Sequence, residues 1–335
     1  MVCVLVASVL WGTTGTAATF APAVGPLAIG AAAMGVGGLL QALIASRAIA
    51  AEWPAVRAQR TVLLLGAGAV AIYPLAFYSS MRLAGVAAGT VVSIGTAPLA
   101  SAVVERLADR RRLPARWIAG AALGLSGTVL LCVSEATAGA SGHGGGRDGW
   151  LTAAGLGLGL AAGVLYAVYS WAAHRLMRRG VTSRAAMGAV FGLGGLMLLP
   201  VLVVTGAPLL ASWPNAAVGA YMAVVPMFTG YLLFGWGLAR IPASTATTLS
   251  LLEPAVAAVL AVLVVGERLP PAGWAGIALV VGCLAVLTTP AQASASRRAP
   301  QPTTTQPTKP RRWSITRHQL QPAASEPSVR RHGGG

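Results

Sequence analysis

Long apolar runs, separated by short polar or basic segments, dominate the chain from residue 2 to about residue 289. About 20 residues of α-helix cross the hydrocarbon core of a bilayer. Ten runs without charge, or with a single charge, are close to this length: 2–20, 27–46, 61–81, 84–104, 117–134, 150–173, 185–205, 216–239, 243–265 and 272–289. Lipid offers the backbone no hydrogen-bond partner, so such runs must be helical. The pattern predicts an all-α membrane protein with ten transmembrane helices.

The first run begins at the N-terminus, which raises the alternative of a cleaved signal peptide. A signal peptide has a basic segment before its apolar core. This run has none, and Thr13, Thr14 and Thr16 interrupt it. We therefore expect a retained transmembrane helix, while the true start of the chain stays open.

Composition supports a bilayer environment and excludes several classes of partner. Only 10% of the 335 residues are charged and 56% are apolar, whereas soluble proteins carry about 25% charged residues. The net charge of +16 lies in short loops and in a C-terminal tail, which argues against a nucleic-acid partner. The three cysteines stand apart from any histidine, so we expect neither a metal site nor a cofactor.

The basic residues predict an orientation, because Lys and Arg accumulate on the cytoplasmic side of membrane proteins. With a cytoplasmic N-terminus, 21 of the 24 basic residues fall on the inner side. They lie mainly in 47–60, 105–116, 174–184 and the tail 290–335. We expect a multi-pass protein of the cell (plasma) membrane with both termini in the cytoplasm.

The sequence repeats itself after about 156 residues. Gly37-Gly38-Leu39 returns as Gly194-Gly195-Leu196, and Arg112-Leu113-Pro114 returns as Arg268-Leu269-Pro270. Each unit holds five runs, an odd number, so the second unit must cross the membrane in the inverted sense. Inverted repeats are the architecture of secondary transporters, in which they support alternating access. The pattern therefore favours transport of a small-molecule substrate.

The repeat also predicts how the chain divides. We expect a first five-helix repeat at 1–134 and a second at 150–289. The segment 135–149 contains six glycines and is predicted to be a flexible linker. The tail 290–335, rich in Pro, Thr, Gln and Arg, is predicted to be disordered.

Several motifs resemble a known family. Trp11-Gly12-Thr13-Thr14-Gly15-Thr16, Arg82-Leu83-Ala84-Gly85-Val86, Leu251-Leu252-Glu253-Pro254 and Gly266-Glu267-Arg268-Leu269 are similar to motifs of the drug/metabolite transporter superfamily. The resemblance is to its EamA-type transporters, which carry two EamA repeats. It implies ten helices in two inverted repeats, a central cavity and efflux of small metabolites. The runs contain no cation, which favours substrates such as amino acids or related neutral or cationic solutes.

The chain departs from that family pattern at two places. The second run has Ala31-Ala32-Ala33 where the family's first repeat often has an arginine. After the fourth run, Arg111 stands opposite Glu267 in the repeat, where an acidic residue is expected. Neither of these groups is therefore available here for a mechanism that needs it.

Glu253 is the single formal charge within the ten runs. A charged residue near the centre of a span costs at least about 2.5 kcal/mol, so such residues face a cavity or a partner. Pro254 disfavours helix at Glu253 and predicts a break there. Pro98 is the repeat equivalent, but Ala97 replaces the acid. Glu253 thus becomes the candidate for binding a proton or a cationic substrate, with a structural helix break as the alternative.

Hydroxyl and aromatic side chains supply the other candidates. Hydroxyls gather on the fourth and ninth runs, and aromatics lie inside the first, third, sixth and eighth. The candidate substrate or coupling residues are Trp11, Thr14, Tyr73, Phe77, Thr90, Ser93, Tyr166, Tyr169, Trp236 and Thr248. Hydrogen bonds within a helix and interfacial anchoring are the alternative roles.

Two other classes of protein stay open at this point. A membrane-embedded enzyme needs paired carboxylates or a histidine-based metal motif inside the spans, and the runs hold one carboxylate and no histidine. A scaffold would show no solute flux. Substrate identity, the coupling ion and the oligomeric state, a homodimer included, are not fixed by the sequence.

Overall fold

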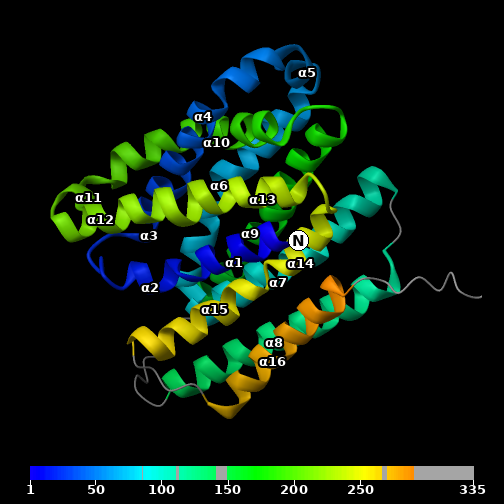
Figure 1. The fold of residues 1–335 in the computed structure, drawn as a ribbon. Coiled ribbons are helices and arrows are strands. Elements are labelled where there is room, and N and C mark those ends of the chain that lie inside the picture. The colour runs from blue at the N-terminus through cyan, green and yellow to red at the C-terminus, as the bar shows by residue number, and fades with distance from the viewer. Residues whose placement is uncertain (85, 111–112, 141–148, 266–269, 290–335) are drawn as a thin grey trace, which may run out of the picture. The chain divides into compact units, whose positions relative to one another are not determined.

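A computed structural model describes residues 1–84, 86–110, 113–140, 149–265 and 270–289, which contain helices and no strand (Figure 1). In chain order the helices are α1 (Val2–Gly12), α2 (Thr14–Ala18), α3 (Pro26–Gly30), η1 (Ala31–Val36), α4 (Gly37–Ala51), α5 (Trp53–Ala58), α6 (Arg60–Ala84), α7 (Val86–Asp109), α8 (Ala115–Ala140), α9 (Gly149–Arg178), α10 (Ser183–Thr205), α11 (Ala207–Leu210), α12 (Trp213–Met222), η2 (Ala223–Thr229), α13 (Gly230–Leu238), α14 (Ala243–Leu249), α15 (Leu252–Leu260), η3 (Ala261–Val265) and α16 (Pro271–Thr288). The elements marked η are π-helices. Most of the predicted linker, the whole tail, Arg111 and Glu267 lie outside the described residues.

The all-α membrane class agrees with the sequence prediction. In the described ranges, seven helical stretches are long and apolar enough to cross a bilayer: Pro26–Ala51, Arg60–Ala84, Gly149–Arg178, Ser183–Thr205, Trp213–Leu238, Ala243–Val264 and Pro271–Thr288. Val2–Ala18 and Ala115–Leu131 are shorter apolar helices. The chain is therefore a multi-pass helical protein, with seven of the ten predicted spans meeting both criteria.

The helices run between two ends of the molecule. One, called here the mouth end, carries residues 19–25 and 206–212, near α2 and α11 in Figure 1. The other, called here the basic end, carries the N-terminus, α5 and residues 239–242. Arginines such as Arg57, Arg175 and Arg240 lie at this second end, which gives it its name.

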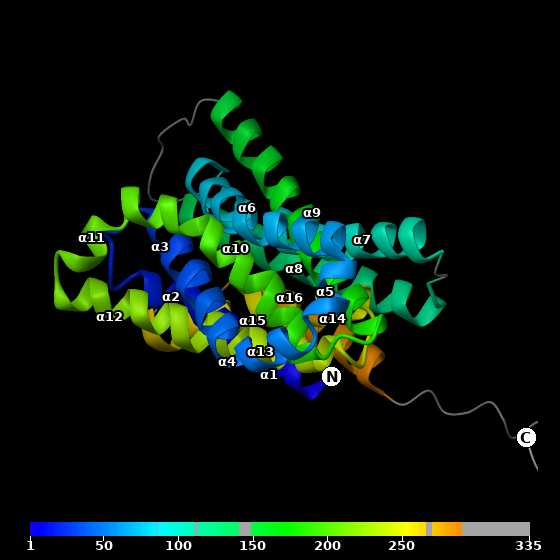
Figure 2. The ribbon, with the colours of Figure 1, turned by 90° about the horizontal axis from the view of Figure 1, so that it is seen from above.

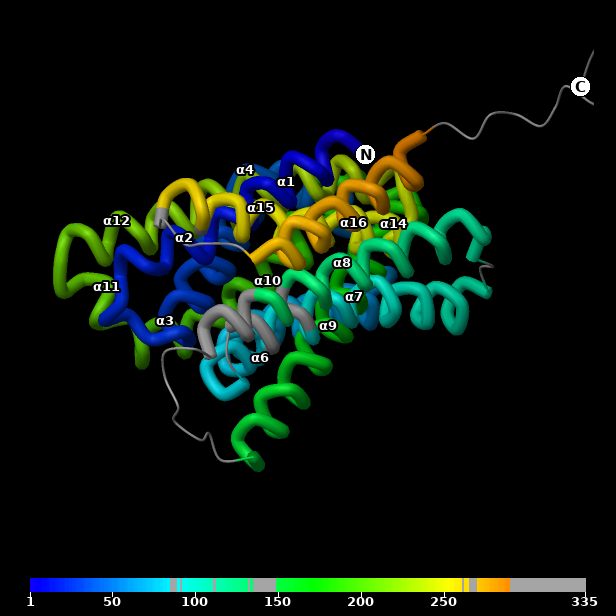
Figure 3. Tube along the Cα trace, turned by 90° about the horizontal axis from the view of Figure 1, so that it is seen from below, coloured from blue at the N-terminus to red at the C-terminus, as the bar shows by residue number. Residues whose placement is uncertain are grey.

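Helices that correspond in the two sequence repeats lie against each other in opposite directions. Along α8 and α16, Gly120 meets Leu287, Gly124 meets Cys283 and Gly127 meets the carbonyl of Gly276 (Figure 3). The partner number falls as the first number rises, so the two helices are antiparallel.

The same arrangement holds for a second pair, α4 with η1 against α10. Gly188 meets Ala45, Gly192 meets Ala42, and Gly195 meets the carbonyl of Gly35. A Cβ atom at Gly195 would lie 2.6 Å from that carbonyl oxygen. Small residues therefore let the two backbones touch, as is common between helices in membranes.

Aromatic rings fill the interior between these outer pairs. α9 packs along both α6 and α7 (Figure 2), and its Tyr166 and Tyr169 are 2% and 0% exposed. Tyr169 contacts Phe191 of α10 with ring centroids 5.4 Å apart, and it contacts Tyr231 of α13. Tyr73 of α6, in the first repeat, also contacts Tyr169 with ring centroids 5.6 Å apart, so the cluster of rings joins both repeats.

Candidate functional site

A cavity of about 450 Å³, the upper cavity, lies at the mouth end. Its wall includes Ala21, Pro22 and Val24 of the loop after α2, as well as exposed Arg82, so it reaches the surface there. Ligand pockets in proteins span about 300–1,000 Å³. The upper cavity has the size that a small metabolite requires.

A second pocket of about 20 Å³, the lower pocket, continues from the upper cavity toward the interior. This volume holds about one water molecule. The two spaces share five lining residues, called here the junction: Trp11, Thr14, Phe77, Tyr78 and Glu253. The cavity therefore narrows at the junction, and the aromatic cluster lies on the far side.

Glu253 stands just after a break between α14 and α15. Ser250 and Leu251 form a turn, and the Glu253 amide donates a hydrogen bond to the carbonyl of Ser250 over 2.9 Å. The break comes two residues earlier than Pro254 alone would suggest, and Pro254 itself is buried in the first turn of α15. The discontinuity brings the carboxylate to the cavity wall.

α1 crosses this break at close range. A Cβ atom at Gly12 would lie 2.9 Å from the carbonyl oxygen of Glu253 and 2.7 Å from Val256. Directly after Gly12, Thr13 forms a turn that separates α1 from α2. Two interrupted helices, one from each repeat, therefore meet at the junction, an arrangement found at the binding sites of transporters.

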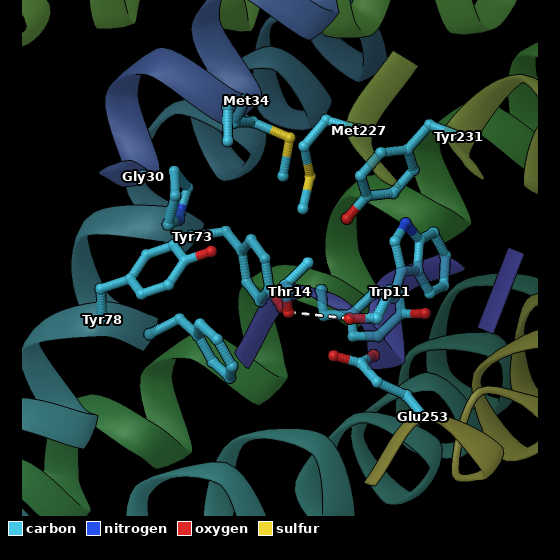
Figure 4. Close-up of a pocket in the computed structure, with 13 residues that line it drawn as sticks. Trp11, Thr14, Gly30, Met34, Tyr73, Tyr78, Met227, Tyr231 and Glu253 are labelled. Carbon is cyan, nitrogen blue, oxygen red and sulfur yellow. Dashed lines mark hydrogen bonds between the residues drawn. The ribbon is translucent and has the colours of Figure 1, made fainter. Parts of the chain in front are cut away.

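The Glu253 carboxylate faces the cavity without a basic partner. Figure 4 shows its side chain turned toward the space beside Thr14 and the aromatic rings. Among the described residues, no Lys, Arg or His nitrogen lies within 4.0 Å of it, because the ion pairs there involve Asp109 alone. A carboxylate in this position can accept a proton or an ammonium group.

Trp11 ties the two repeats together above the lower pocket. Its Nε1–H donates to the carbonyl of Pro226 in η2 over 3.0 Å. Its ring lies 4.8 Å from that of Tyr231 and 6.3 Å from that of Tyr166, measured between centroids. The candidate residues Trp11 and Tyr166 therefore lie in a single wall.

Two π-helices border the lower pocket. Met34 of η1 and Met227 of η2 lie on the side opposite Glu253 (Figure 4). π-Helical turns are rare and are frequent at functional sites. Methionine side chains are unbranched and adapt to different shapes, so this side of the pocket is deformable.

The structure brings most of the candidate residues to these two spaces. Thr14 donates a hydrogen bond to the carbonyl of Trp11 over 2.7 Å and lines both of them. Tyr73, Phe77 and Tyr166 line the lower pocket, and Thr90 lines the upper cavity together with Pro254.

Other candidate residues lie elsewhere. Trp236 is 46% exposed and lies beside Met1 and Cys3 at the basic end. Thr248 donates to the carbonyl of Ser244 within its own helix. Ser93 is buried where α7 packs on Gly159 of α9.

Two further candidates lie outside the lining of both spaces. Tyr169 lies deeper than the lower pocket, with its hydroxyl 2.8 Å from that of Tyr231. Pro98 lies inside the continuous helix α7, so the expected helix break is present in the second repeat and not at its first-repeat equivalent.

The sequence analysis missed several lining residues. Tyr78, Tyr231, Met34 and Met227 all line the lower pocket. Tyr78 lies inside the same apolar run as Tyr73 and Phe77, so its aromatic type within a span was a usable signal. The methionines are apolar residues in apolar runs, so no sequence signal separates them from packing residues.

The carboxylates that the structure describes at the basic end have hydrogen-bond or arginine partners, unlike Glu253. Asp109 pairs with Arg175 and lies 3.9 Å from Arg178. Glu52 accepts hydrogen bonds from the amide and hydroxyl of Thr182 over 2.7 and 2.8 Å. Within the described ranges, no three His, Cys, Asp or Glu side chains are placed to hold a metal ion.

Comparisons with known proteins agree with this architecture. Residues 1–133 and 153–289 each match the EamA-like transporter family. A solved crystal structure with no stated function superposes with a TM-score of 0.66 at 24% identity, covering 86% of this chain and 95% of that one. At that identity the likeness concerns the fold alone.

Relatives of the chain carry transporter names. The uncharacterized transporter YwfM of Bacillus subtilis is 32% identical over 85% of this chain and 92% of its own length. A protein of Streptantibioticus cattleyicolor, named a "probable terminal-alkyne amino-acid exporter", is 30% identical over 83% and 90%. The threonine/homoserine exporter RhtA of Salmonella typhimurium is 28% identical over 68% and 73%. By its two matched stretches and these relatives, the chain belongs to the EamA-like transporter family.

Proposed function

We propose that this protein is a secondary active transporter that exports small amine-bearing metabolites, amino acids in particular, by alternating access. It crosses the plasma membrane ten times as two inverted repeats, 1–134 and 150–289. These are joined by the linker 135–149 and followed by a cytoplasmic tail, 290–335. The observation that carries the proposal is the carboxylate of Glu253, which lines a metabolite-sized cavity without a basic partner.

Alternating access is supported by the geometry of the repeats. α8 with α16, and α4 with α10, are repeat-related pairs that run antiparallel, as inversion across the membrane requires. The upper cavity reaches the surface at the mouth end, while aromatic rings fill the interior beyond the junction. This is the arrangement expected of one state of a transporter, with a path on one side only.

The lining of the upper cavity supports the substrate class. Its charged side chains in the described part of the chain are Glu253 at the inner end and Arg82 near the surface. An acid and a base on one wall suit the ammonium and carboxylate groups of an amino acid. RhtA and the Streptantibioticus protein are named for amino-acid substrates, which supports the same class.

Glu253 can serve in either of two ways. It can bind the substrate ammonium group, with Trp11 and the tyrosines providing aromatic faces for the cation. It can instead bind the proton that couples export to a gradient. Both ligands would bind the same carboxylate, so the proton and the ammonium group compete for it.

Purified protein in lipid vesicles tests the function. We would measure uptake of threonine, of other amino acids, of the corresponding amines and of carboxylic acids without an amine, with and without a pH gradient. We expect amine-bearing compounds alone to be transported. Transport of the amine-free acids at equal rates would contradict the substrate class, and no flux with any compound would contradict transport itself.

The variant Glu253→Gln separates the two roles. It keeps the size and hydrogen-bonding capacity of the side chain but cannot titrate. If Glu253 binds the coupling proton alone, gradient-driven flux falls while exchange without a gradient persists. If it binds the substrate, both activities fall together. Wild-type flux in this variant over a pH series would leave Glu253 with a structural role.

Orientation is tested by labelling single cysteines with an impermeant reagent. We expect positions 110 and 178, which stand at the basic end, to react only from the cytoplasmic side. Position 18, in the wall of the upper cavity, should react from outside. Strong external labelling at 110 or 178 would reverse the proposed topology.

A further inference from the structure

A second buried carboxylate lies at the basic end, outside the cavity. Glu105 of α7 is 2% exposed. One of its carboxylate oxygens accepts the amide hydrogen of Ser244 over 3.1 Å, and the other accepts the Ser244 hydroxyl over 2.7 Å. Ser244 lies 139 positions further along the chain, in the second repeat.

These two hydrogen bonds satisfy the start of α14. Ser244 is the second residue of that helix, and the first amide groups of a helix have no partner within it. A buried carboxylate is tolerated only when hydrogen bonds compensate its lost hydration. While the basic end is closed, the Glu105 carboxylate and the N-terminal amide groups of α14 therefore satisfy each other's hydrogen bonds.

α14 is fastened to α7 a second time, one turn further along. The hydroxyl of Thr247 lies 3.1 Å from the hydroxyl of Ser101, and it shares its one hydrogen between Ser101 and the carbonyls of Ala243 and Ser244 in its own helix. The two contacts define the α7–α14 seam, and they run in opposite order along the two helices. α14 then ends at the turn before Glu253. The seam thus connects the basic end to the junction through fewer than ten residues of chain.

The α7–α14 seam differs from the antiparallel pairs that small residues hold together. Between α8 and α16, backbone atoms touch at Gly127 and Gly276. The seam is held instead by hydroxyl and carboxylate groups, which can exchange their protein partners for water when the two helices separate. A seam of this kind can open and close reversibly.

We propose that Glu105 is the latch of the inner gate: its hydrogen bonds to Ser244 hold α14 on α7 while the mouth end is open, and they break when the basic end opens. Glu105 is a positioning residue, since it lies outside the substrate cavity and acts through α14. The inference rests on the proposed alternating access. To that mechanism the inference adds a location: the α7–α14 seam is where the basic end opens.

The rate at which a seam residue reacts with a thiol reagent measures gate opening directly. In a background with Cys3, Cys132 and Cys283 replaced by alanine, Ser101→Cys provides the reporter, because Ser101 is fully buried in the seam. Ser244→Ala or Glu105→Gln should raise its labelling rate from the basic side by about 10- to 100-fold, the worth of a hydrogen bond to a charged group. Ser244→Thr retains the hydroxyl and should restore the slow rate.

Glu52→Gln is the matched control. Glu52 accepts the amide and hydroxyl of Thr182 in the same way as Glu105 accepts those of Ser244. It joins elements of the α4–α10 pair, which small residues hold together, so its loss should leave the reporter rate unchanged. Equal acceleration by Glu52→Gln would indicate general loosening and overturn the latch.

A reversible cross-link gives the second measurement. Ser101→Cys combined with Thr247→Cys should form a disulfide across the seam and stop transport, and a reductant should restore it. Normal transport by the cross-linked protein would overturn the inference.

The labelling assay requires no substrate, so failure of the latch and failure of the proposed function can be told apart. If the variants label faster at Ser101→Cys but the protein transports no amine, the role of Glu105 as a latch is supported and the proposed substrate class is contradicted. If the protein transports amines but the variants leave the labelling rate unchanged, only the role of Glu105 as a latch is contradicted.

Discussion

Carboxylate groups have different surroundings at the basic end of this protein and in the cavity that opens at its mouth end. At the basic end, Asp109 has arginine partners, and Glu105 and Glu52 each accept two hydrogen bonds. At the mouth end, Glu253 lines a cavity without a basic partner in the described residues.

The difference is informative because burying a carboxylate is costly unless it is paired or hydrogen-bonded. Engaged carboxylates at the basic end can be explained by stability alone. Glu253 is partly exposed to the cavity and has no basic partner among the described residues, and under the proposed function a visiting ligand supplies that partner. Changes to the two sets of carboxylates should therefore have opposite signatures: loss of transport at the mouth end, and loss of stability or of gating at the basic end.

The largest effect is expected from Glu253→Gln. We expect a loss of transport of about 10- to 100-fold, the value of a hydrogen bond to a charged group, with an unfolding temperature at or above that of the unmodified protein. Vesicle flux and thermal unfolding in detergent measure the two. A Glu253→Gln protein that is markedly destabilised yet transports normally would show that Glu253 has a structural role, like the carboxylates at the basic end.

Trp11→Phe should have the next largest effect. It leaves the buried carbonyl of Pro226 without the indole donor, which costs about 1–3 kcal/mol of unfolding free energy. Transport should fall as well, since the junction loses its shape. Trp236→Phe is the control, because Trp236 is 46% exposed and should leave both quantities unchanged. Equal effects of Trp11→Phe and Trp236→Phe would contradict a specific role for Trp11 at the junction.

Asp109→Asn should have a smaller effect, on stability alone. Its partners Arg175 and Arg178 have side chains that are 26% and 56% exposed, and exposed ion pairs contribute at most about 1 kcal/mol. Unfolding measured over a salt series is the test, because screening should shrink the difference between the variant and the parent protein. A difference that grows with salt would exclude the ion pair as its cause.

Thr90→Val should produce the smallest change, limited to apparent substrate affinity. Thr90 lines the upper cavity, whereas Ser93, one turn further along α7, is buried against α9. Loss of one neutral hydrogen bond is worth about 1 kcal/mol, or roughly a fivefold change in affinity. Ser93→Ala should leave substrate affinity unaltered. A larger effect of Ser93→Ala than of Thr90→Val would contradict the assignment of Thr90 to the cavity wall.

Much of the fold was predictable because a bilayer imposes it. Apolar runs of sufficient length have to be helices, and the repeat at about 156 residues identifies which helices correspond. Polar residues around Thr13 mark an interruption of the first run but do not fix the residue at which the helix breaks, and nothing in the sequence of η1 or η2 specifies a π-helix. Tertiary packing decides such local changes.

The site was predictable only where a residue type is costly in a membrane. Glu253 was identified because a charge inside a span needs a reason. Trp11 and Trp236 both looked like interior aromatics, and only the structure separates a buried ring from one that is 46% exposed. Glu105 stands one residue beyond an apolar run and counted as a loop charge, because nothing in the sequence shows that Ser244 reaches it.

The glycine contacts between α8 and α16 and between α4 and α10 also constrain the mechanics of the molecule. Backbone atoms approach one another directly at Gly127, Gly276 and Gly195, so the two helices of each pair are held close together. Each pair should therefore travel as one rigid body, although its two helices come from different halves of the gene product. Under the proposed alternating access, we expect the moving units to be these cross-repeat pairs and not the two repeats of the sequence.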